Sequence, residues 1–472
     1  MTRKVEVAIV GAGTAGLAAL AQVKKKTDSY VLINGGELGT TCARVGCMPS
    51  KVAIQVADDF QRRTIFEREA IEGGESLSVD IPEAFEHVRD IRDILVDRVL
   101  SHTTDDMGEE LIDGYAHFIA PGVLQVDDQT IEAENIILAV GTSPVIPEAW
   151  RQYGEQILTT DSLFELEQWP SSMAIIGLGV IGLEMGQALQ RLGIQVNAFD
   201  MQDNIAGIAD PAVLSIAVTI IGKELPLHLG KQVTIEQQGD LLSVSNGEVS
   251  VAVEKVLLAT GRRSNLYNMQ LENSGIPLRD DGLPKYNPNT TRVVDSRVFV
   301  AGDADVFRPI LHEASAEGKI AGYNAVRSDT TAFIRNTSLQ ITFSDPNICQ
   351  IGEPFDTLHL DEIVIGEQVF GPLGRALIMG KNKGLLRIYV RKADGILLGA
   401  AMVATKGENL AHLIAWSIEQ HMTVQQVLGM PYYHPTIEEA LQAAARNAIS
   451  KLPHLVEDQD YPADLKPLSS LL

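Results

Sequence analysis

The chain has 472 residues, about three times an ordinary domain, so we expect two to four cooperating domains. Hydrophobic residues at 45% and charged residues at 21% exclude disordered, collagen-like and coiled-coil proteins. Acidic side chains number 62 against 38 basic ones, and the net charge of −24 disfavours nucleic acid and anionic membrane surfaces as partners, while the 3 cysteines exclude a disulfide-stapled scaffold.

Apolar periodicity predicts a strand over Val5–Val10, the turn GAGTAG, a helix to about Lys25 and a second strand over Tyr30–Ile33. This order is the opening βαβ unit of a doubly wound sheet. Three glycines serve, in order, the tight turn, the approach of a pyrophosphate and close packing of helix on strand: Gly11, Gly13 and Gly16. The helix N-terminus then offers free N–H groups to the phosphates.

The same N-terminal run imitates a signal peptide, because Arg3 and Lys4 precede an apolar stretch. Its glycines and Glu6 argue against that interpretation. No apolar stretch reaches the roughly 18 to 20 residues that span a bilayer. We therefore expect a soluble, cytoplasmic protein without a membrane partner.

At the end of the second strand, where an acid usually accepts a hydrogen bond from a ribose hydroxyl, the chain has Asn34. An amide can still bond a hydroxyl, but it lacks the charge.

The pattern returns at Met173–Ile176, followed by GLGVIG, a helix to Leu192 and a strand over Gln195–Phe199 that ends in Asp200. The glycines with the three roles are Gly177, Gly179 and Gly182. An acid in this position accepts from a free 2′-hydroxyl and repels a 2′-phosphate, and the next residues supply no Arg or Lys, so NAD is favoured over NADP. Two such units suggest two dinucleotides, such as a flavin and a nicotinamide.

Three further segments are typical of buried strands that end in tight turns: Ile136–Thr142, Val256–Arg262 and Val298–Ala304. The last places Asp303 just beyond a strand end, where its carboxylate could accept from a ribityl hydroxyl.

Cys42 and Cys47 lie in GTTCARVGCMPSK. Five residues of regular helix rise about 7.5 Å, too far for a disulfide, which needs Cα atoms within about 6.8 Å. A disulfide therefore requires a bend, which Gly46 and Pro49 would allow. The pair could instead be two inert thiols or half a metal site, but no second cysteine pair or histidine cluster supports a metal. Cys349 has no partner and is expected to be buried and inert.

The cysteine motif with its following Pro49-Ser50-Lys51, and HPTIEE at His434–Glu439, resemble motifs of the pyridine nucleotide–disulfide oxidoreductases. The resemblance runs from Val5 to about Ile449, with the motifs in the family's order. It implies an α/β protein with two doubly wound dinucleotide-binding domains and an α+β C-terminal dimerisation domain. The implied limits are an FAD domain at 1–148, an NAD domain at 149–270, a central domain at 271–335 that completes the FAD site, and the dimerisation domain at 336–472.

The resemblance also implies the roles of individual residues. Cys42 exchanges with the substrate sulfur, and Cys47 lies against the flavin as a thiolate with Lys51 nearby, paired with Glu184. His434 is the base, oriented by Glu439 and supplied by the other subunit of a homodimer. The remaining FAD contacts would be Gly11, Gly13, Gly16, Asn34, Thr41, Lys51, Ala116, Gly141, Asp303 and His312, and the NAD contacts Gly177, Gly179, Gly182, Asp200 and Gly261.

The activity that fits best is electron transfer between dihydrolipoamide and NAD, through FAD and a Cys42–Cys47 disulfide, with free lipoamide or a carrier-bound lipoyl group as substrate. An NAD(P)H-dependent reductase of another small disulfide, or a flavin-bearing redox sensor without turnover, remains an alternative. No cysteine pair follows residue 449, as mercuric and large thioredoxin reductases require, and soluble transhydrogenases lack the second cysteine. Ala43-Arg44, where the family has Leu-Asn or Val-Asn, and Val140, where it has Thr, mark a divergent branch.

Overall fold

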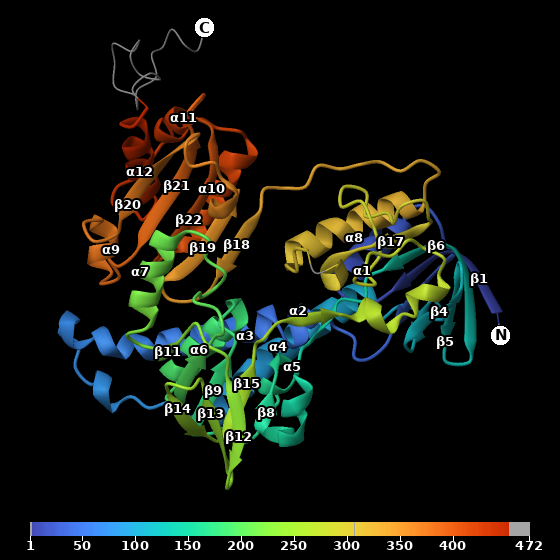
Figure 1. Ribbon diagram of the computed structural model, residues 1–472, viewed down its shortest axis with the longest axis horizontal. Coiled ribbons are helices and arrows are strands. Elements are labelled where there is room, and N and C mark those ends of the chain that lie inside the picture. Colours follow the sequence, from blue (N-terminus) through green and yellow to red (C-terminus); the bar gives the residue numbers. More distant parts are fainter. Residues whose placement is uncertain (1, 306, 453–472) are drawn as a thin grey trace.

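A computed structural model describes residues 2–305 and 307–452 and confirms the predicted α/β class (Figure 1). The end of the predicted dimerisation domain, 453–472, lies outside the described residues. Within the described part, no helix combines the length and the apolar character needed to cross a bilayer. The limits of the four domains stay predictions from the sequence.

The first sheet has seven strands in the order β3-β2-β1-β6-β5-β4, with β17 also paired to β6. The neighbours β3, β2, β1, β6 and β17 run parallel, whereas β4 and β5 form an antiparallel meander with β6. The carboxyl ends of the parallel strands therefore share one edge. The strands are β1 (Thr2–Val10), β2 (Tyr30–Asn34), β3 (Leu111–Asp113), β4 (Ala116–Ala120), β5 (Val123–Val126), β6 (Gln129–Leu138) and β17 (Val298–Val300).

Five helices accompany this sheet: α1 (Thr14–Val23), α2 (Thr41–Arg44), α3 (Cys47–Gln61), α4 (Ile81–Thr103) and α8 (Leu311–Ala325). Figure 1 shows α1 and α8 side by side over the sheet, while α3 and α4 extend away from it toward α6. Val5–Val10, which resembles the apolar core of a signal peptide, is part of the central strand β1.

The second parallel sheet has the order β11-β10-β9-β15-β8. Its elements are β8 (Ile157–Leu158), α5 (Thr160–Leu163), β9 (Ser172–Ile176), α6 (Val180–Arg191), β10 (Gln195–Phe199), α7 (Pro211–Ile221), β11 (Leu227–His228) and β15 (Lys255–Leu258). A three-stranded sheet adjoins it: β12 (Thr234–Gln238), β13 (Leu241–Ser245) and β14 (Ser250–Val253). The chain enters and leaves this region through an antiparallel ribbon of β7 (Thr142–Pro144) and β16 (Arg262–Ser264).

Two of the predicted strand-and-turn segments are confirmed, and the structure fixes where each strand ends and its glycine turn begins. The segment predicted at Ile136–Thr142 belongs to β6, which ends at Leu138, and the one predicted at Val256–Arg262 ends at Leu258. The reason is the turns that follow, where Gly141 and Gly261 take φ values of +63° and +109°. The residues after each turn join the β7–β16 ribbon instead.

The C-terminal sheet is antiparallel, in the order β18-β19-β22-β21-β20. Helices α10 and α12 cover one face, and α7 packs against β21 and β22 (Figure 1). Its elements are β18 (Leu339–Thr342), β19 (Asn347–Gly352), β20 (Ile363–Val369), α9 (Gly374–Ile378), β21 (Leu385–Arg391), β22 (Leu397–Ala404), α10 (Gly407–Glu419), α11 (Val424–Leu428) and α12 (Glu439–Ile449). Cys349 is buried in this core, where burial raises the pKa of its thiol, as expected of an inert residue.

Candidate active site

The first glycine turn joins β1 to α1 at the carboxyl edge of the first sheet. Gly11 has φ +105°, and a Cβ there would lie 2.3 Å from the Ala139 carbonyl oxygen. A Cβ on Gly16 would lie 1.8 Å from the Gly11 carbonyl oxygen, so helix and turn touch closely. A Cβ on Gly13 would meet nothing within 4 Å. The open space at Gly13, the N-cap of α1, fits a pyrophosphate on the helix N-terminus.

The second turn repeats this geometry between β9 and α6. Gly177 has φ +97°, and its Cβ would lie 2.4 Å from the Ala259 carbonyl oxygen, while a Cβ on Gly182 would lie 1.9 Å from the Gly177 carbonyl oxygen. Gly179 caps α6 and again faces open space. Each of the two units thus contains a cradle that fits a dinucleotide phosphate.

Asn34 is the last residue of β2 and Asp200 directly follows β10, and both lie beside these turns. The Ala12 N–H donates to Asn34 Oδ1 at 3.0 Å, and the Asn34 amide donates to the Gly36 carbonyl at 2.9 Å. The Leu178 N–H donates to Asp200 Oδ2 at 2.6 Å. Both side chains therefore anchor their glycine turn, and each stands where the ribose acceptor is expected.

The structure also brings the backbone of Lys231 beside Asp200, which the sequence pattern did not indicate. The Lys231 N–H donates to the Asp200 carbonyl at 3.4 Å, because the segment after β11 runs beside the end of β10. Lys231 Nζ pairs with Glu248 Oε1 at 2.5 Å. The residues that directly follow Asp200 in the sequence do not indicate this lysine, since the pairing of β11 with β10 brings it there.

Asp303 follows β17 at the same edge as the first glycine turn, as predicted. Burial raises the pKa of its carboxyl, and the Arg262 guanidinium opposes that shift. Arg262 donates from Nε to Thr142 Oγ1 at 2.8 Å and from Nη2 to the Thr142 carbonyl at 2.7 Å, which locks the β7–β16 ribbon. Neither Arg262 nor Thr142 was predicted from the sequence as a site residue.

The other predicted FAD contacts are spread around the first sheet. The Gly114 N–H donates to the Asn34 carbonyl at 3.0 Å, so Ala116 begins β4 close to the end of β2. Thr41 is the exposed first residue of α2, and His312 is exposed at the start of α8.

The cysteine segment bends between its two thiols. Helix α2 ends at Arg44, and α3 begins at Cys47 after Gly46, whose φ and ψ are −125° and −117°. A Cβ on Gly46 would lie 3.0 Å from the Thr41 carbonyl oxygen and 3.3 Å from Cys42 Cα. The predicted bend at Gly46 is confirmed, whereas Pro49 lies in the first turn of α3, where its missing N–H has no helical partner to lose.

Both thiols are free in this structure, and they differ in acidity. A hydrogen bond from the Cys42 thiol lowers the pKa of Cys47 to about 7; burial opposes this shift, and the Lys51 ammonium adds to it. The same hydrogen bond, together with burial, raises the pKa of Cys42. Cys47 also begins α3, where the helix dipole favours an anion. The pair can thus hold one thiolate and one thiol near neutral pH.

Lys51 lies one turn after Cys47 on α3 and reaches α6. Its Nζ lies 2.8 Å from Glu184 Oε2, and the Glu184 side chain is only 3% exposed. The other carboxylate oxygen of Glu184 accepts from the Phe343 N–H at 2.8 Å. The structure therefore brings Lys51 and Glu184 together across 133 residues of chain. Phe343 was not found from the sequence.

His434 and Glu439 form a second pair, at the start of α12. His434 Nδ1 lies 2.9 Å from Glu439 Oε1, and Glu439 Oε2 accepts from the Thr436 N–H at 2.9 Å. The hydrogen bond from His434 and then that from the Thr436 N–H lower the pKa of the Glu439 carboxyl. The imidazole side chain is 79% exposed, so its Nε2 edge is open to a substrate.

Within one described chain, the His434–Glu439 pair does not lie beside the cysteine pair. Figure 1 shows α12, with Glu439 at its start, in the C-terminal body and well apart from α2.

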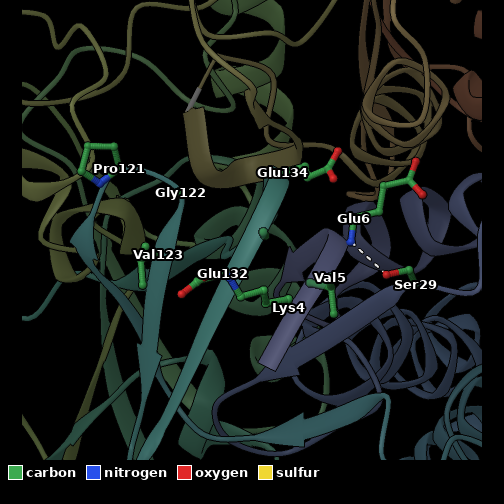
Figure 2. A pocket seen from close by; sticks show the side chains of 10 residues that line it. Lys4, Val5, Glu6, Ser29, Pro121, Gly122, Val123, Glu132 and Glu134 are labelled. Carbon is green, nitrogen blue, oxygen red and sulfur yellow. Dashed lines mark hydrogen bonds and ion pairs between the residues drawn. The ribbon is translucent and has the colours of Figure 1, made fainter. Parts of the chain in front are cut away.

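A separate hollow of about 610 Å³ lies at the opposite edge of the first sheet (Figure 2). Its walls come from the early residues of β1 and β6 and from the β4–β5 turn, including Lys4, Glu6, Glu132 and Glu134. Because the glycine turns lie at the carboxyl ends of the strands, this hollow is distinct from the dinucleotide cradles.

Comparison with known proteins agrees with this geometry. Residues 5–318 match the family described as pyridine nucleotide-disulphide oxidoreductase, and residues 338–445 match the dimerisation domain of that family. A dihydrolipoyl dehydrogenase of Geobacillus stearothermophilus is 27% identical, over 96% of this chain and 97% of the relative. A soluble pyridine nucleotide transhydrogenase of Mycobacterium tuberculosis is 24% identical, over 95% of this chain and 98% of the relative.

Among solved structures, LpdA from Mycobacterium tuberculosis superposes with a TM-score of 0.81 at 22% identity, covering 94% of this chain and 99% of that one. This likeness confirms the fold. The chain belongs to the pyridine nucleotide-disulphide oxidoreductases, a family of flavoproteins that bind FAD and NAD(P)H and carry a dimerisation domain.

Proposed function

We propose that the protein is a homodimeric dihydrolipoamide dehydrogenase that uses NAD. The observation that carries the proposal is the unequal thiol pair, in which the pKa of Cys47 is lowered to about 7 and that of Cys42 is raised. Such a pair can act as an electron carrier, with one sulfur ready to leave as a thiolate and the other to exchange with a substrate. The dihydrolipoyl dehydrogenase relative, which aligns along nearly its whole length, supports the choice of substrate.

In this proposal the resting protein has a Cys42–Cys47 disulfide. A substrate thiolate attacks Cys42 Sγ, and Cys47 leaves as a thiolate, stabilised by Lys51 and the start of α3. The second substrate sulfur then displaces Cys42, which closes the lipoamide disulfide and leaves a reduced cysteine pair. A bound FAD would supply the two-electron chemistry that links this reduced cysteine pair to NAD⁺.

His434 accepts the proton that each substrate thiol must lose, and Glu439 orients the imidazole through Nδ1. The exposed imidazole, and the position of α12 well apart from α2 in Figure 1, support a base supplied to the partner's cysteine pair. Asp200, anchored beside the second cradle, favours NAD because its charge repels a 2′-phosphate.

A reductase of another small disulfide is the second candidate, and Arg44 is the observation that favours it. This arginine lies on α2 between the two cysteines, where the family usually has an amide. It pairs with Glu37, and a guanidinium in this position would suit a disulfide that carries carboxylates.

A substrate panel tests the proposal. NAD⁺ reduction by dihydrolipoamide is measured beside NADH and NADPH oxidation by lipoamide, glutathione disulfide and cystine, with Cys42→Ser as the inactive control. Turnover of lipoamide in both directions with NAD(H) supports the first candidate. Turnover of only an anionic disulfide supports the second, and reduction of the protein without turnover of any disulfide indicates a sensor.

A further inference from the structure

We propose that Phe343, held in place by Gln187 and Asp345, is a positioning residue that fixes the Lys51 ammonium beside Cys47. The proposal rests on the proposed function for its consequence in catalysis, since a mobile Lys51 would stabilise the Cys47 thiolate less well. Its geometric basis is separate from the choice of substrate.

The Lys51 ammonium contacts a carboxylate and an aromatic ring. Its Nζ lies 2.8 Å from Glu184 Oε2 and 4.7 Å from the centroid of the Phe343 ring. The same Glu184 carboxylate accepts from the Phe343 N–H at 2.8 Å. The lysine is thus held between a carboxylate and an aromatic face, and a ring at this distance attracts a cation.

The segment that carries Phe343 is fastened along α6. Gln187, one turn after Glu184, accepts from the Asp345 N–H at 2.7 Å and donates to the Asp345 carbonyl at 3.0 Å. Together with the bond from the Phe343 N–H to Glu184, these hydrogen bonds connect the segment to two consecutive turns of α6. Gln187 is buried, and its Nε2 also donates to Glu224 Oε2 at 2.9 Å, so loss of the two bonds to Asp345 would leave its Oε1 without the Asp345 N–H as donor.

The Asp345 side chain fixes the same segment from the other side. Its carboxylate lies 2.9 Å from Lys381 Nζ and 3.3 Å from Arg191 Nη2. Arg191 is only 5% exposed and also pairs with Asp58 of α3 and with Glu224. Burial opposes ionisation of Asp345, but Lys381 and Arg191 outweigh it and lower the pKa of that carboxyl.

The network therefore joins α3, α6 and the segment before β19. Asp58 and Lys51 lie two turns apart on α3, and Arg191 and Glu184 lie two turns apart on α6. Both ends of the contact between the two helices are thus closed by ion pairs, and Phe343 covers the end nearer to Cys47.

The charged and titratable groups that act on Cys47 are Cys42, Lys51 and Glu184. Glu184 raises the thiol's pKa while Lys51 lowers it, so their net effect depends on where the ammonium lies between them. A ring that keeps Lys51 in place favours the thiolate.

The test is the pH midpoint for ionisation of Cys47 in the reduced protein. It is measured from thiolate ultraviolet absorbance, with Cys47→Ser subtracted as the baseline. Phe343→Leu removes the ring and keeps an apolar side chain, and we expect the midpoint to rise by about half a unit or more. Phe343→Tyr keeps the ring and should stay within about 0.2 units of the unaltered protein.

Phe355→Leu is the matched control, because its ring lies 5.6 Å from the Arg387 guanidinium and 5.4 Å from the Tyr389 ring. Its midpoint should not move. Equal midpoints for Phe343→Leu and Phe343→Tyr, or an equal rise in Phe355→Leu, would overturn the proposal.

Asp345→Asn provides a second, independent arm should Phe343→Leu fail to fold. It removes the charge that holds the segment but leaves Phe343 in the chain, and we expect a smaller rise in the same direction; an unchanged midpoint in a folded Asp345→Asn protein counts against the proposal. Lipoamide turnover of the unaltered protein is measured separately. Its absence would refute the proposed substrate without affecting the titration.

Discussion

Asn34 and Asp200 take the same position in the two dinucleotide units, each accepting a hydrogen bond from the backbone N–H that follows the first glycine of its turn. The bonds measure 3.0 Å to Asn34 Oδ1 and 2.6 Å to Asp200 Oδ2. An amide and a carboxylate can therefore both anchor the turn, but only Asp200 carries the charge that, in the proposed function, would distinguish NAD from NADP.

Replacing Asp200 should relax the preference between nicotinamide cofactors. In the unaltered protein we expect kcat/KM for NADH to exceed that for NADPH by about tenfold or more, a difference of ~1.4 kcal/mol. Asp200→Ser keeps a hydroxyl that can accept from the Leu178 N–H and removes the repulsion, so the ratio should fall toward one. Steady-state kinetics with both cofactors measure this ratio.

Lys231 allows a second variant that extends this experiment. Glu248 pairs with the ammonium of Lys231, whose backbone N–H contacts the Asp200 carbonyl, so Glu248→Gln would free that ammonium. Combined with Asp200→Ser it should raise kcat/KM for NADPH further, because a free ammonium attracts the 2′-phosphate. Equal use of NADH and NADPH by the unaltered protein would contradict the role of Asp200.

The thiolate at Cys47 should give the reduced protein a defined pH dependence. Because the pKa of Cys47 is lowered to about 7, its thiolate is present above that pH and is lost as the pH falls through it. The long-wavelength absorbance of a thiolate against the flavin should fall in the same range. Lys51→Met removes the cation and should move the midpoint upward; a midpoint unchanged in Lys51→Met would show that Lys51 does not act on Cys47.

The two cysteines should differ when each is replaced by serine. Cys47→Ser leaves no thiolate for the flavin and should abolish the long-wavelength band on two-electron reduction. Cys42→Ser retains Cys47 and hence a band, while turnover of disulfides is lost because no sulfur remains to exchange with the substrate. Absorbance spectra and lipoamide assays check both expectations, and an exchange of the two phenotypes would reverse the assigned roles.

Features fixed by local geometry could be predicted from the sequence. Gly11 and Gly177 are needed for positive φ, and Gly16 and Gly182 are needed because a Cβ would strike the turn before them. The bend at Gly46 follows in the same way from the spacing of two cysteines. Each of these depends on residues within one turn and its adjoining elements.

Features that depend on strand pairing or domain packing could not be found this way. Lys231 comes beside Asp200 only because β11 pairs with β10. Phe343 reaches Lys51 only because the segment after β18 runs along α6, and no periodicity in the sequence indicates it. The pairing of Lys51 with Glu184 came from family resemblance, since 133 residues separate them.

His434 and Glu439 should differ in the size of their effect on the half-reaction with dithiol. His434→Gln removes the base, and we expect that half-reaction to slow by about 10²- to 10⁴-fold, the usual contribution of a positioned acid–base group. Glu439→Gln should slow the half-reaction less than His434→Gln does, because the imidazole remains and the Thr436 N–H can still bond to the side chain at position 439. Rapid-mixing measurements of both half-reactions provide the check. Reduction by NADH should be nearly unchanged, and a comparable loss there would indicate a structural defect.

The last prediction concerns which subunit supplies the base. If His434 acts on the partner's cysteines, a mixture of His434→Gln and Cys42→Ser subunits should regain activity. In a mixed dimer, one site combines the intact cysteines of the first subunit with the intact histidine of the second, while the other site has both defects. A site built within a single chain would be defective in both subunits and could not recover. Mixed dimers, isolated by two different affinity tags after exchange of subunits, should therefore show about half the unaltered activity per dimer, because one of the two sites is intact. Inactive mixed dimers that still bind FAD would place the base in the same chain as its cysteines.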